Sequence, residues 1–362
     1  TEQAIYDAAG ETFNINSPKQ LGVILFEKLG LPHGKKTKTG WSTNADVLEK
    51  LRYDAPIVAD VLRYRQYAKL KSTYVDGLLK VIDPDGRVRT SFQMTVTATG
   101  RLSSTEPNLQ NIPTRTELGS QLRRMFTAPE GCVLVDADYS QIELRLLAHI
   151  AGDAEMQAAF RSGADFHTVT ASRVFHVPPE EVTPEMRRRA KAVNFGIVYG
   201  ISAFSLAQDI GVSVAEAKAY MERYFETYQG VRQYMTDVVA KAEQDGYVQT
   251  LMHRRRALPE LKSSNFNLRE FGKRVALNMP VQGTAADIMK LAMVRVHRRL
   301  KQEGLRARLL MQVHDELIVE CPASEREQVE RLLTEEMEQA ASLSVPLIAE
   351  AHSGKNWLAA KE

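Results

Sequence analysis

Cysteine is nearly absent from this chain of 362 residues, which holds only Cys132 and Cys321, far apart in the sequence. Two isolated cysteines exclude a disulfide framework and a zinc site built on CxxC pairs, so both are expected to be buried, reduced thiols. No apolar run approaches the length of about 18 residues that a membrane helix needs, and Thr1–Gln3 begins no signal-peptide pattern. The sequence therefore predicts a cytoplasmic protein with no membrane partner.

A strong net charge of one sign is also missing, because 47 Lys and Arg stand against 45 Asp and Glu, for a formal charge of +2. This balance excludes a polycation that holds nucleic acid by bulk charge, but it allows a local basic groove. The hydrophobic fraction of 44% and the charged fraction of 25% are ordinary for a globular protein and argue against a disordered chain. The length suggests two or three domains, or one elaborate domain.

Local patterns predict a largely helical chain with two regions of strand. Ser17–Leu29 begins with an N-cap serine and a proline, and its leucines and isoleucine share one face. The lysine-rich stretch Gly34–Gly40 is either a solvated loop or a segment that follows a phosphate backbone. Periodicity and β-branched content predict helix over 44–74, strand at 87–99 and 131–138, mostly helix over 140–340, and two short strands within 308–322.

The first candidate site follows the predicted strand 131–138. Asp136 and Asp138 alternate with apolar residues, so both face one side of the strand, and the chain turns into a helix soon after Asp138. A carboxylate at a strand end suits a hard divalent cation, and two such carboxylates without a cation would repel each other. On local geometry alone either aspartate could be the ligand, and a solvent-facing strand edge with a helix cap is the plain alternative.

The second candidate is the tripeptide His314-Asp315-Glu316, which lies between two apolar strands. Turns favour Asp, so an ordinary turn explains the pattern equally well. The functional interpretation needs a second carboxylate from a distant segment, since two such groups could bridge a pair of Mg²⁺ ions for phosphoryl transfer. We expect the carboxylates at such a centre to be matched by metal rather than by Lys or Arg.

The third candidate is the most specific of the patterns. Arg187, Lys191, Phe195 and Tyr199 recur at four-residue steps, so a helix would carry them as one stripe of two cations and two aromatic rings. Such a stripe is typical of a site for a ligand with a polyphosphate at one end and a flat base at the other. The alternative is an exposed basic helix start that runs into core aromatics.

Two polar segments are candidates for contact with nucleic acid. The loop that opens at Gly100 is dense in hydrogen-bonding side chains, so it either follows a nucleic-acid backbone or is an ordinary polar loop. Asn278–Gly283 is expected to start a helix, with Gln282 either facing a minor groove, where every base pair presents acceptors, or acting as a structural amide. The candidate residues of the loop are Arg101, Asn108, Gln110, Asn111 and Arg115.

Together these segments resemble the polymerase domain of family A DNA polymerases, the group of the bacterial DNA polymerase I enzymes. DYSQIELR, RRRAKAVNFGIVYG and QVHDELIVE are similar to that family's motifs A, B and C, and TATGRLSSTEPNLQNIP and NMPVQGTAAD to two further blocks. The five blocks stand in the family's order, and the resemblance covers essentially the whole chain. The resemblance implies an α+β, mostly helical right-hand fold. Its parts would be an antiparallel-sheet palm (87–152 and 283–362), helical fingers (153–282) and a helical thumb (1–86) truncated at its N-terminus.

The resemblance also implies roles for single residues. Asp138 and Asp315 would bridge two Mg²⁺ ions, for which Mn²⁺ can substitute, with the Tyr139 carbonyl as a further ligand and Glu316 beside them. Lys191 would donate a proton to the leaving pyrophosphate. The incoming deoxynucleoside triphosphate would contact a set in which Glu143 excludes a ribose 2′-hydroxyl: Arg187, Lys191, His167, Phe195, Tyr199, Gln141 and Glu143.

The implied partners are a DNA primer-template and dNTPs, with a monomeric chain acting in replication and repair in the bacterial cytosol or nucleoid. DNA contacts are implied for Arg101, Asn108, Gln110, Asn111, Arg115, Asn278, Gln282, His314, Lys69 and Lys71. The family's amino-terminal nuclease domains have no counterpart in this sequence, so we expect neither proofreading nor flap cleavage from it. The competing hypotheses are a DNA-binding fragment with little turnover and a related RNA polymerase or reverse transcriptase.

Overall fold

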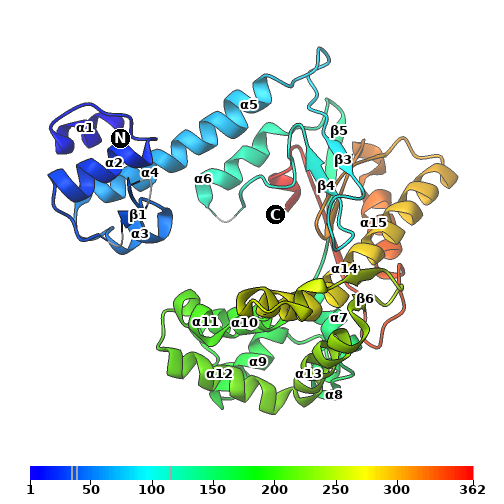
Figure 1. Cartoon of the computed structure of the whole chain (residues 1–362). Helices are drawn as coiled ribbons and strands as arrows, with labels where there is room; N and C mark the ends of the chain where they lie inside the picture. The colour runs from blue at the N-terminus through cyan, green and yellow to red at the C-terminus, as the bar shows by residue number, and fades with distance from the viewer. Residues whose placement is uncertain (34–35, 38–39, 115, 362) are drawn as a thin grey trace. The chain divides into compact units, whose positions relative to one another are not determined.

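The computed structural model describes residues 1–33, 36–37, 40–114 and 116–361, so Arg115 and most of the stretch Gly34–Gly40 lie outside the described residues. The chain divides into two compact units, Thr1–Ser91 and Phe92–Glu362. Figure 1 traces the chain from the N-terminus in blue to the C-terminus in red. Within the described residues, no helix is both long enough and apolar enough to cross a membrane.

The unit Thr1–Ser91 is a group of short helices around a small apolar core. Ser17 caps α2 by accepting a hydrogen bond from the Gln20 amide, and Pro18 occupies the first turn, so the predicted helix start is confirmed. The predicted helix over 44–74 is wrong at 51–55, because Ala55 before Pro56 is extended and the helix restarts there. The elements are α1 (Glu2–Ala9), α2 (Pro18–Gly22), the π-helical η1 (Val23–Lys28), β1 (Lys36–Thr37), β2 (Gly40–Trp41), α3 (Ala45–Lys50), α4 (Pro56–Leu70), the π-helical η2 (Lys71–Val75) and α5 (Asp76–Leu79).

The unit Phe92–Glu362 is built on a four-stranded antiparallel sheet in the order β10-β5-β9-β8. Strand β5 confirms the strand predicted at 131–138, and β8 and β9 confirm the pair predicted to meet at His314-Asp315. The register places Asp138 of β5 between Glu316 of β9 and Glu350 of β10. The strands are β5 (Cys132–Tyr139), β8 (Arg308–Val313), β9 (Glu316–Pro322) and β10 (Ala349–Gly354).

The two faces of β5 have different surroundings. Val133, Val135 and Ala137 are buried in a core that includes Leu332 of α15 and Ile288 of α14. Because side chains alternate along a strand, Leu134, Asp136 and Asp138 face the other way. The core therefore holds the strand in place while its acidic residues stand on the opposite face. The packing helices are α7 (Ile142–Ile150), α14 (Phe266–Gln302) and α15 (Arg326–Glu338).

Further helices of this unit lie between α7 and α14, with one short hairpin, and they confirm the predicted helical stretch. Their bounds are α8 (Ala154–Arg161), α9 (Phe166–Phe175), α10 (Pro184–Val198), α11 (Ala203–Ile210), α12 (Val214–Thr227), α13 (Gln229–Asp245) and the 3₁₀ helix η5 (Pro259–Lys262), with β6 (Tyr247–Gln249) and β7 (Arg255–Ala257). The remaining elements are β3 (Ser91–Gln93), β4 (Ser103–Thr105), α6 (Glu117–Ser120) and the 3₁₀ helices η3 (Gln121–Met125), η4 (Pro179–Glu181), η6 (Ala323–Glu325) and η7 (Ala359–Lys361).

Two local predictions fail in this unit. Only Ser91–Gln93 of the stretch 87–99 is a strand, because β-propensity requires a sheet to pack on, and Met94 and Val96 are exposed. Asn278–Gly283 does not start a helix but lies inside the 37-residue helix α14. Pro280 is buried within this helix, and the helix continues through it.

Candidate active site

Asp138 and Asp136 share a face of β5 but differ in exposure. The Asp138 side chain is 49% exposed, whereas that of Asp136 is 2% exposed. Asp136 accepts a hydrogen bond of 3.1 Å from the indole nitrogen of Trp357. The structure thus presents Asp138 to solvent and uses Asp136 in an internal contact, a distinction that the sequence pattern left open.

Asp315 reaches the end of β5 through the turn between β8 and β9. His314 adopts a left-handed conformation with φ of 51° at this turn. The Tyr139 amide then donates a hydrogen bond of 3.0 Å to the Asp315 carbonyl oxygen. This contact extends the pairing of β5 with β9 by one residue. It places Asp138 and Asp315 at the same end of the two central strands.

The acids at this edge are shifted towards their neutral forms. Burial raises the pKa of Asp315 to about 6, with Arg101 opposing the shift and Glu143 and Asp138 adding to it. Burial, with the charge of Glu316, raises the pKa of Asp136 to about 7. Burial also raises the pKa of Glu316. A site with such a surplus of buried negative charge favours a cation.

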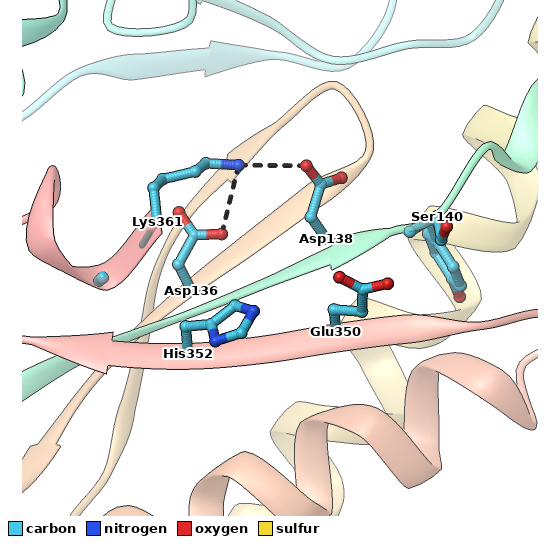
Figure 2. Close-up of a pocket in the computed structure, with 8 residues that line it drawn as sticks. Asp136, Asp138, Ser140, Glu350, His352 and Lys361 are labelled. Atoms are coloured by element: carbon cyan, nitrogen blue, oxygen red, sulfur yellow. Dashed lines mark hydrogen bonds and ion pairs between the residues drawn. The ribbon is translucent and has the colours of Figure 1, made fainter. Parts of the chain in front are cut away.

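Besides Arg123, which lies 3.5 Å from Glu316, two basic side chains contact these acids, contrary to the expectation that metal rather than Lys or Arg would match them. Arg101 Nη2 lies 3.5 Å from Asp315 Oδ1. Lys361 Nζ contacts Glu316, lies 3.1 Å from Asp138 Oδ2 and lies 3.6 Å from Asp136 Oδ1. Figure 2 shows Lys361 reaching from η7 towards the two aspartates of β5. Both cations come from segments remote from β5, so no local pattern could have predicted the pairing.

Glu143 is buried, at 4% exposure, and is held from both sides. Arg101 donates to its Oε1 at 2.8 Å, and the Tyr199 hydroxyl donates to its Oε2 at 2.6 Å. Gln141, directly before α7, is left-handed with φ of 55°, and its buried Oε1 has no partner among the described residues. The two oxygens of Glu143 are thereby fixed in one orientation at the start of α7.

The stripe of cations and rings is carried by α10, as the spacing predicts. Thr183 caps this helix, and Tyr199 follows its last residue. Lys191 is exposed and Phe195 is partly buried. Arg187 forms a two-pronged ion pair with Asp165, at 2.8 and 3.0 Å. The helix therefore brings the four residues onto one side, with one of its two cations already paired.

His167 lies beside this stripe and is buried. Asn194 donates a hydrogen bond of 2.9 Å to its Nδ1 and accepts one from Thr170, which orients the amide. Burial lowers the pKa of His167 to about 4, with the charge of Asp165 opposing the shift. The imidazole is therefore neutral near pH 7 and carries its proton on Nε2. Its ring centroid is 5.7 Å from that of Phe195.

The residues with expected DNA contacts fall into several environments. Asn108, Asn111 and His314 are exposed, and Asn278 and Gln282 lie partly buried on α14. Gln110 is buried and donates to the Gln312 carbonyl at 3.0 Å. Lys69 and Lys71 belong to the unit Thr1–Ser91, where both are exposed and Lys71 pairs with Asp76 at 2.6 Å. The described residues therefore leave each of these assignments a prediction.

Three residues at the site had no role in the sequence interpretation: Lys361, Trp357 and Asp165. Lys361 and Trp357 lie in the short segment after β10, which carries no repeating pattern. Asp165 could have been found as a helix start, because it caps α9 by accepting from the Thr168 amide. Its pairing with Arg187 depends on the packing of α9 against α10, which the sequence does not show.

The chain is similar to known proteins along nearly its whole length. The family model for DNA polymerase family A matches residues 1–359. DNA polymerase I of Bacillus caldotenax is 58% identical over 99% of this chain, and that of Bacillus subtilis (strain 168) is also 58% identical over 99%. The chain spans 41% of the length of each of these relatives. A POL domain from M. smegmatis, in complex with a DNA primer-template and dNTP, matches with a TM-score of 0.94 at 50% identity, over 100% of this chain and 64% of that one.

An antiparallel sheet that carries acids at one edge, flanked by a basic and aromatic helix, defines the class as a polymerase fold of the right-hand type. The chain belongs to DNA polymerase family A. The α+β, mostly helical architecture expected from the sequence is confirmed by the same match.

Proposed function

We propose that this chain carries out template-directed DNA synthesis, adding deoxynucleoside monophosphates from dNTPs to a primer 3′-hydroxyl with release of pyrophosphate. The observation that carries the proposal is the hydrogen bond of 3.0 Å from the Tyr139 amide to the Asp315 carbonyl. It brings a carboxylate at the end of β5 and one in the turn before β9 to the same end of the sheet, and two-metal phosphoryl transfer requires two such carboxylates. The relatives named DNA polymerase I support the same activity.

The donor set at this edge fits Mg²⁺. Among the residues that the structure describes, no three His, Cys, Asp or Glu side chains form a closed metal cage. Mg²⁺ in phosphoryl-transfer sites is held by one or two carboxylates together with substrate phosphates and water, so an open pair of hard oxygen donors suffices. Asp138 and Asp315, with the Tyr139 carbonyl, would hold the ions. When bound, the ions lower the pKa of the attacking hydroxyl and stabilise charge on the leaving group.

The residues of α10 and α9 would position the incoming triphosphate. Lys191 is exposed and available to phosphate oxygens, and it is also the proposed proton donor to pyrophosphate. Arg187 would exchange its Asp165 partner for a phosphate, since both groups accept from a guanidinium in the same way. His167 would donate from Nε2 as a neutral imidazole. Phe195 would pack against the base and sugar of the nucleotide.

Glu143 would exclude a ribose by occupying the space beneath the sugar. Its side chain is pinned by Arg101 and Tyr199, so it cannot swing aside to accept a 2′-hydroxyl. This rigidity is the physical reason to prefer a DNA polymerase over a related RNA polymerase. Gln141 lies directly before the same helix and completes the proposed nucleotide site.

We assign residues 87–152 and 283–362 to a palm, 153–282 to fingers and 1–86 to a thumb, with a DNA primer-template as the partner. The neighbouring POL domain was solved with a DNA primer-template and dNTP, which supports these partners. The DNA contacts proposed are those of Arg101, Asn108, Gln110, Asn111, Arg115, Asn278, Gln282, His314, Lys69 and Lys71. We further propose that the protein acts as a monomer in the bacterial cytosol.

Primer extension on a defined template tests the proposal directly. With Mg²⁺ and all four dNTPs the protein should extend the primer to the template end, and chelation of the metal should stop extension while leaving the gel shift of the primer-template. Ribonucleotides and an RNA template serve as matched controls for sugar and template choice. Binding without extension under any metal would contradict the proposal and favour a DNA-binding fragment.

A further inference from the structure

The Lys361 ammonium stands among three carboxylates from two strands. It contacts Glu316 of β9 and lies 3.1 Å from Asp138 and 3.6 Å from Asp136 of β5. The side chain is 26% exposed, so the contact lies at the border between the interior and solvent. A permanent positive charge thus stands beside the proposed metal ligand Asp138.

The segment that carries Lys361 is anchored firmly before it reaches the acids. The Trp357 side chain is buried, with its indole nitrogen on Asp136, its amide donating to the Phe126 carbonyl, and the Arg123 guanidinium 4.2 Å above its ring. A Cβ at Gly354 would lie 2.6 Å from the Ala359 carbonyl carbon, so the segment packs directly on the backbone of β10. This packing fixes the origin of the Lys361 side chain relative to β5 and β9.

The lysine divides the acids of the site into two sets. Asp136 and Glu316 are buried and already have polar partners in Trp357, Arg123 and Lys361. Asp138 is half exposed and shares only its Oδ2 with the lysine. Asp315 has no contact with Lys361 and faces Arg101 instead. Asp138 and Asp315 are therefore the pair left accessible to further cations.

We infer that Lys361 is a positioning residue of the carboxylate site. Its ammonium lies between Glu316 and the Oδ2 atom of Asp138, and so directs divalent cations to the side of Asp138 that faces Asp315. The inference rests on the proposed function, because it concerns the ions of the same site. Figure 2 shows the arrangement, with Glu350 and His352 of β10 bordering the pocket beside the lysine.

Removing the charge of Lys361 should have an effect that would not follow if the lysine had only a structural role. Removing the positive charge while keeping the length of the side chain should strengthen divalent cation binding, because a repulsive charge a few ångströms away is lost. Coulombic energies at such a distance in a partly solvated site correspond to a change in the dissociation constant of about threefold to tenfold. The additional binding would use Glu316 and the Asp138 oxygen freed from the lysine, away from Asp315, so it should not help extension.

The experiment measures Mn²⁺ binding to the metal-free, DNA-free protein by the EPR signal of the free ion. Lys361→Met should bind Mn²⁺ about threefold to tenfold more tightly than the unchanged protein, while its maximal primer-extension rate with saturating metal falls. Lys361→Arg, which keeps the charge, should restore both values. Lys355→Met is the matched control, because it removes the same charge from the same segment at an exposed position.

The outcomes separate this inference from the proposed function. Unchanged or weaker Mn²⁺ binding in Lys361→Met overturns the positioning role, and a lower melting temperature alongside it assigns the lysine to folding alone. An equal gain in Lys355→Met also overturns it, since the effect would then be one of net charge. Failure of the proposed function would appear elsewhere, as undiminished Mn²⁺ binding and extension in Asp138→Asn.

Discussion

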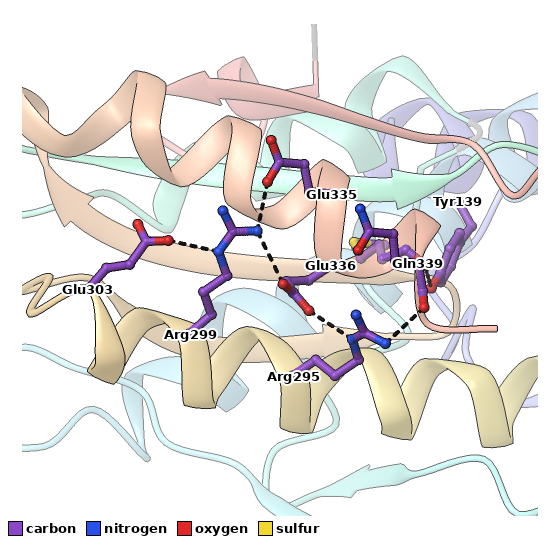
Figure 3. A network of polar contacts seen from close by, with 8 residues as sticks. Tyr139, Arg295, Arg299, Glu303, Glu335, Glu336 and Gln339 are labelled. Atoms are coloured by element: carbon purple, nitrogen blue, oxygen red, sulfur yellow. Dashed lines mark hydrogen bonds and ion pairs between the residues drawn. The ribbon is translucent and has the colours of Figure 1, made fainter.

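Two clusters of charged side chains in Phe92–Glu362 shift the pKa values of their acids in opposite directions. The first joins α14 to α15, and Figure 3 shows its members interleaved between the two helices. Arg299 contacts Glu303 and Glu335 at 2.7 Å and Glu336 at 3.1 Å, and Arg295 contacts Glu336 at 2.8 Å. Burial alone would raise the pKa of Glu336, but hydrogen bonds from both arginines lower it. Hydrogen bonds to Glu303 and Glu335 likewise raise the pKa of Arg299.

In the second cluster, the candidate site, burial shifts the pKa values of several acids and of one histidine towards the neutral forms. Burial is the largest cause at Asp136, with a pKa of about 7, at Asp315, with a pKa of about 6, and at His167, with a pKa of about 4. The acids named in the network between the helices pair with arginines, whereas two acids of the site are held partly towards their neutral forms. Groups held against their preferred ionisation mark places where a fold has given up stability for function.

The largest effect should come from removing one negative charge from each cluster by an isosteric change. Asp138→Asn should lower the primer-extension rate at least about 1,000-fold, because several kcal/mol of metal-assisted stabilisation of the transition state are lost. Its melting temperature should stay equal or rise. Glu336→Gln should leave the extension rate at 25 °C within about twofold but lower the melting temperature, since two arginines lose a charged partner. Extension rates and thermal scans of the two variants, side by side, test the contrast, and equal extension rates would remove it.

The stability of the protein should depend on pH through the buried base His167. The pKa of His167 is lowered from its ordinary value of 6.5 to about 4 in the folded state. A depressed base is neutral when folded and protonated when unfolded, so its contribution to stability is present above pH 6.5 and lost as the pH falls towards 4. The loss amounts to on the order of 3 kcal/mol. Urea unfolding of the protein and of His167→Gln between pH 4 and 7 should give curves that converge at the acidic end. Parallel curves would show that the imidazole titrates normally.

Glu143 differs from the other acids of the site, because both of its carboxylate oxygens accept a hydrogen bond. Glu143→Ala removes the acid that Arg101 and Tyr199 hold beneath the proposed sugar position. We expect incorporation of ribonucleotides to rise about 10-fold to 200-fold relative to deoxynucleotides, the range for changing one group in a binding pocket. Single-nucleotide extension with matched ribo and deoxy triphosphates measures the ratio. Glu143→Gln, which keeps the size of the side chain, is the control, and an unchanged ratio in Glu143→Ala would refute the sugar-exclusion role.

The smallest effect should come from loosening the network between the helices. Arg299→Met removes one arginine and leaves Arg295 on Glu336, so we expect a loss of about 1 kcal/mol in the free energy of unfolding. The loss should shrink at high salt, because the contacts are partly exposed. Arg298→Met, at the neighbouring exposed position of α14, should change stability much less. Urea denaturation at low and high salt measures both, and an equal loss in the two variants would show that the network is not specific.

The sequence anticipated the parts of this protein that depend on neighbours along the chain. The alternation in Cys132–Tyr139 predicted the strand and its acidic face, and the turn at His314-Asp315 was predicted between two strands. The four-residue spacing of Arg187, Lys191, Phe195 and Tyr199 placed them on α10. Where the surroundings outweighed local preference, prediction failed, as at 87–99, where only Ser91–Gln93 has a partner strand, and at Asn278–Gly283, which lies inside α14.

The contacts between distant segments depend on the tertiary structure and could not be predicted from the sequence. The sequence could name Asp136 and Asp138 as candidates, but their difference in exposure depends on Trp357, which arrives from the segment after β10. Likewise, Lys361 beside Asp138 and Arg101 beside Asp315 are pairings of residues with no common local pattern. Local sequence determines which backbone conformation is lowest in free energy. The surroundings of a charged group depend instead on every segment that packs around it, and those surroundings set its ionisation.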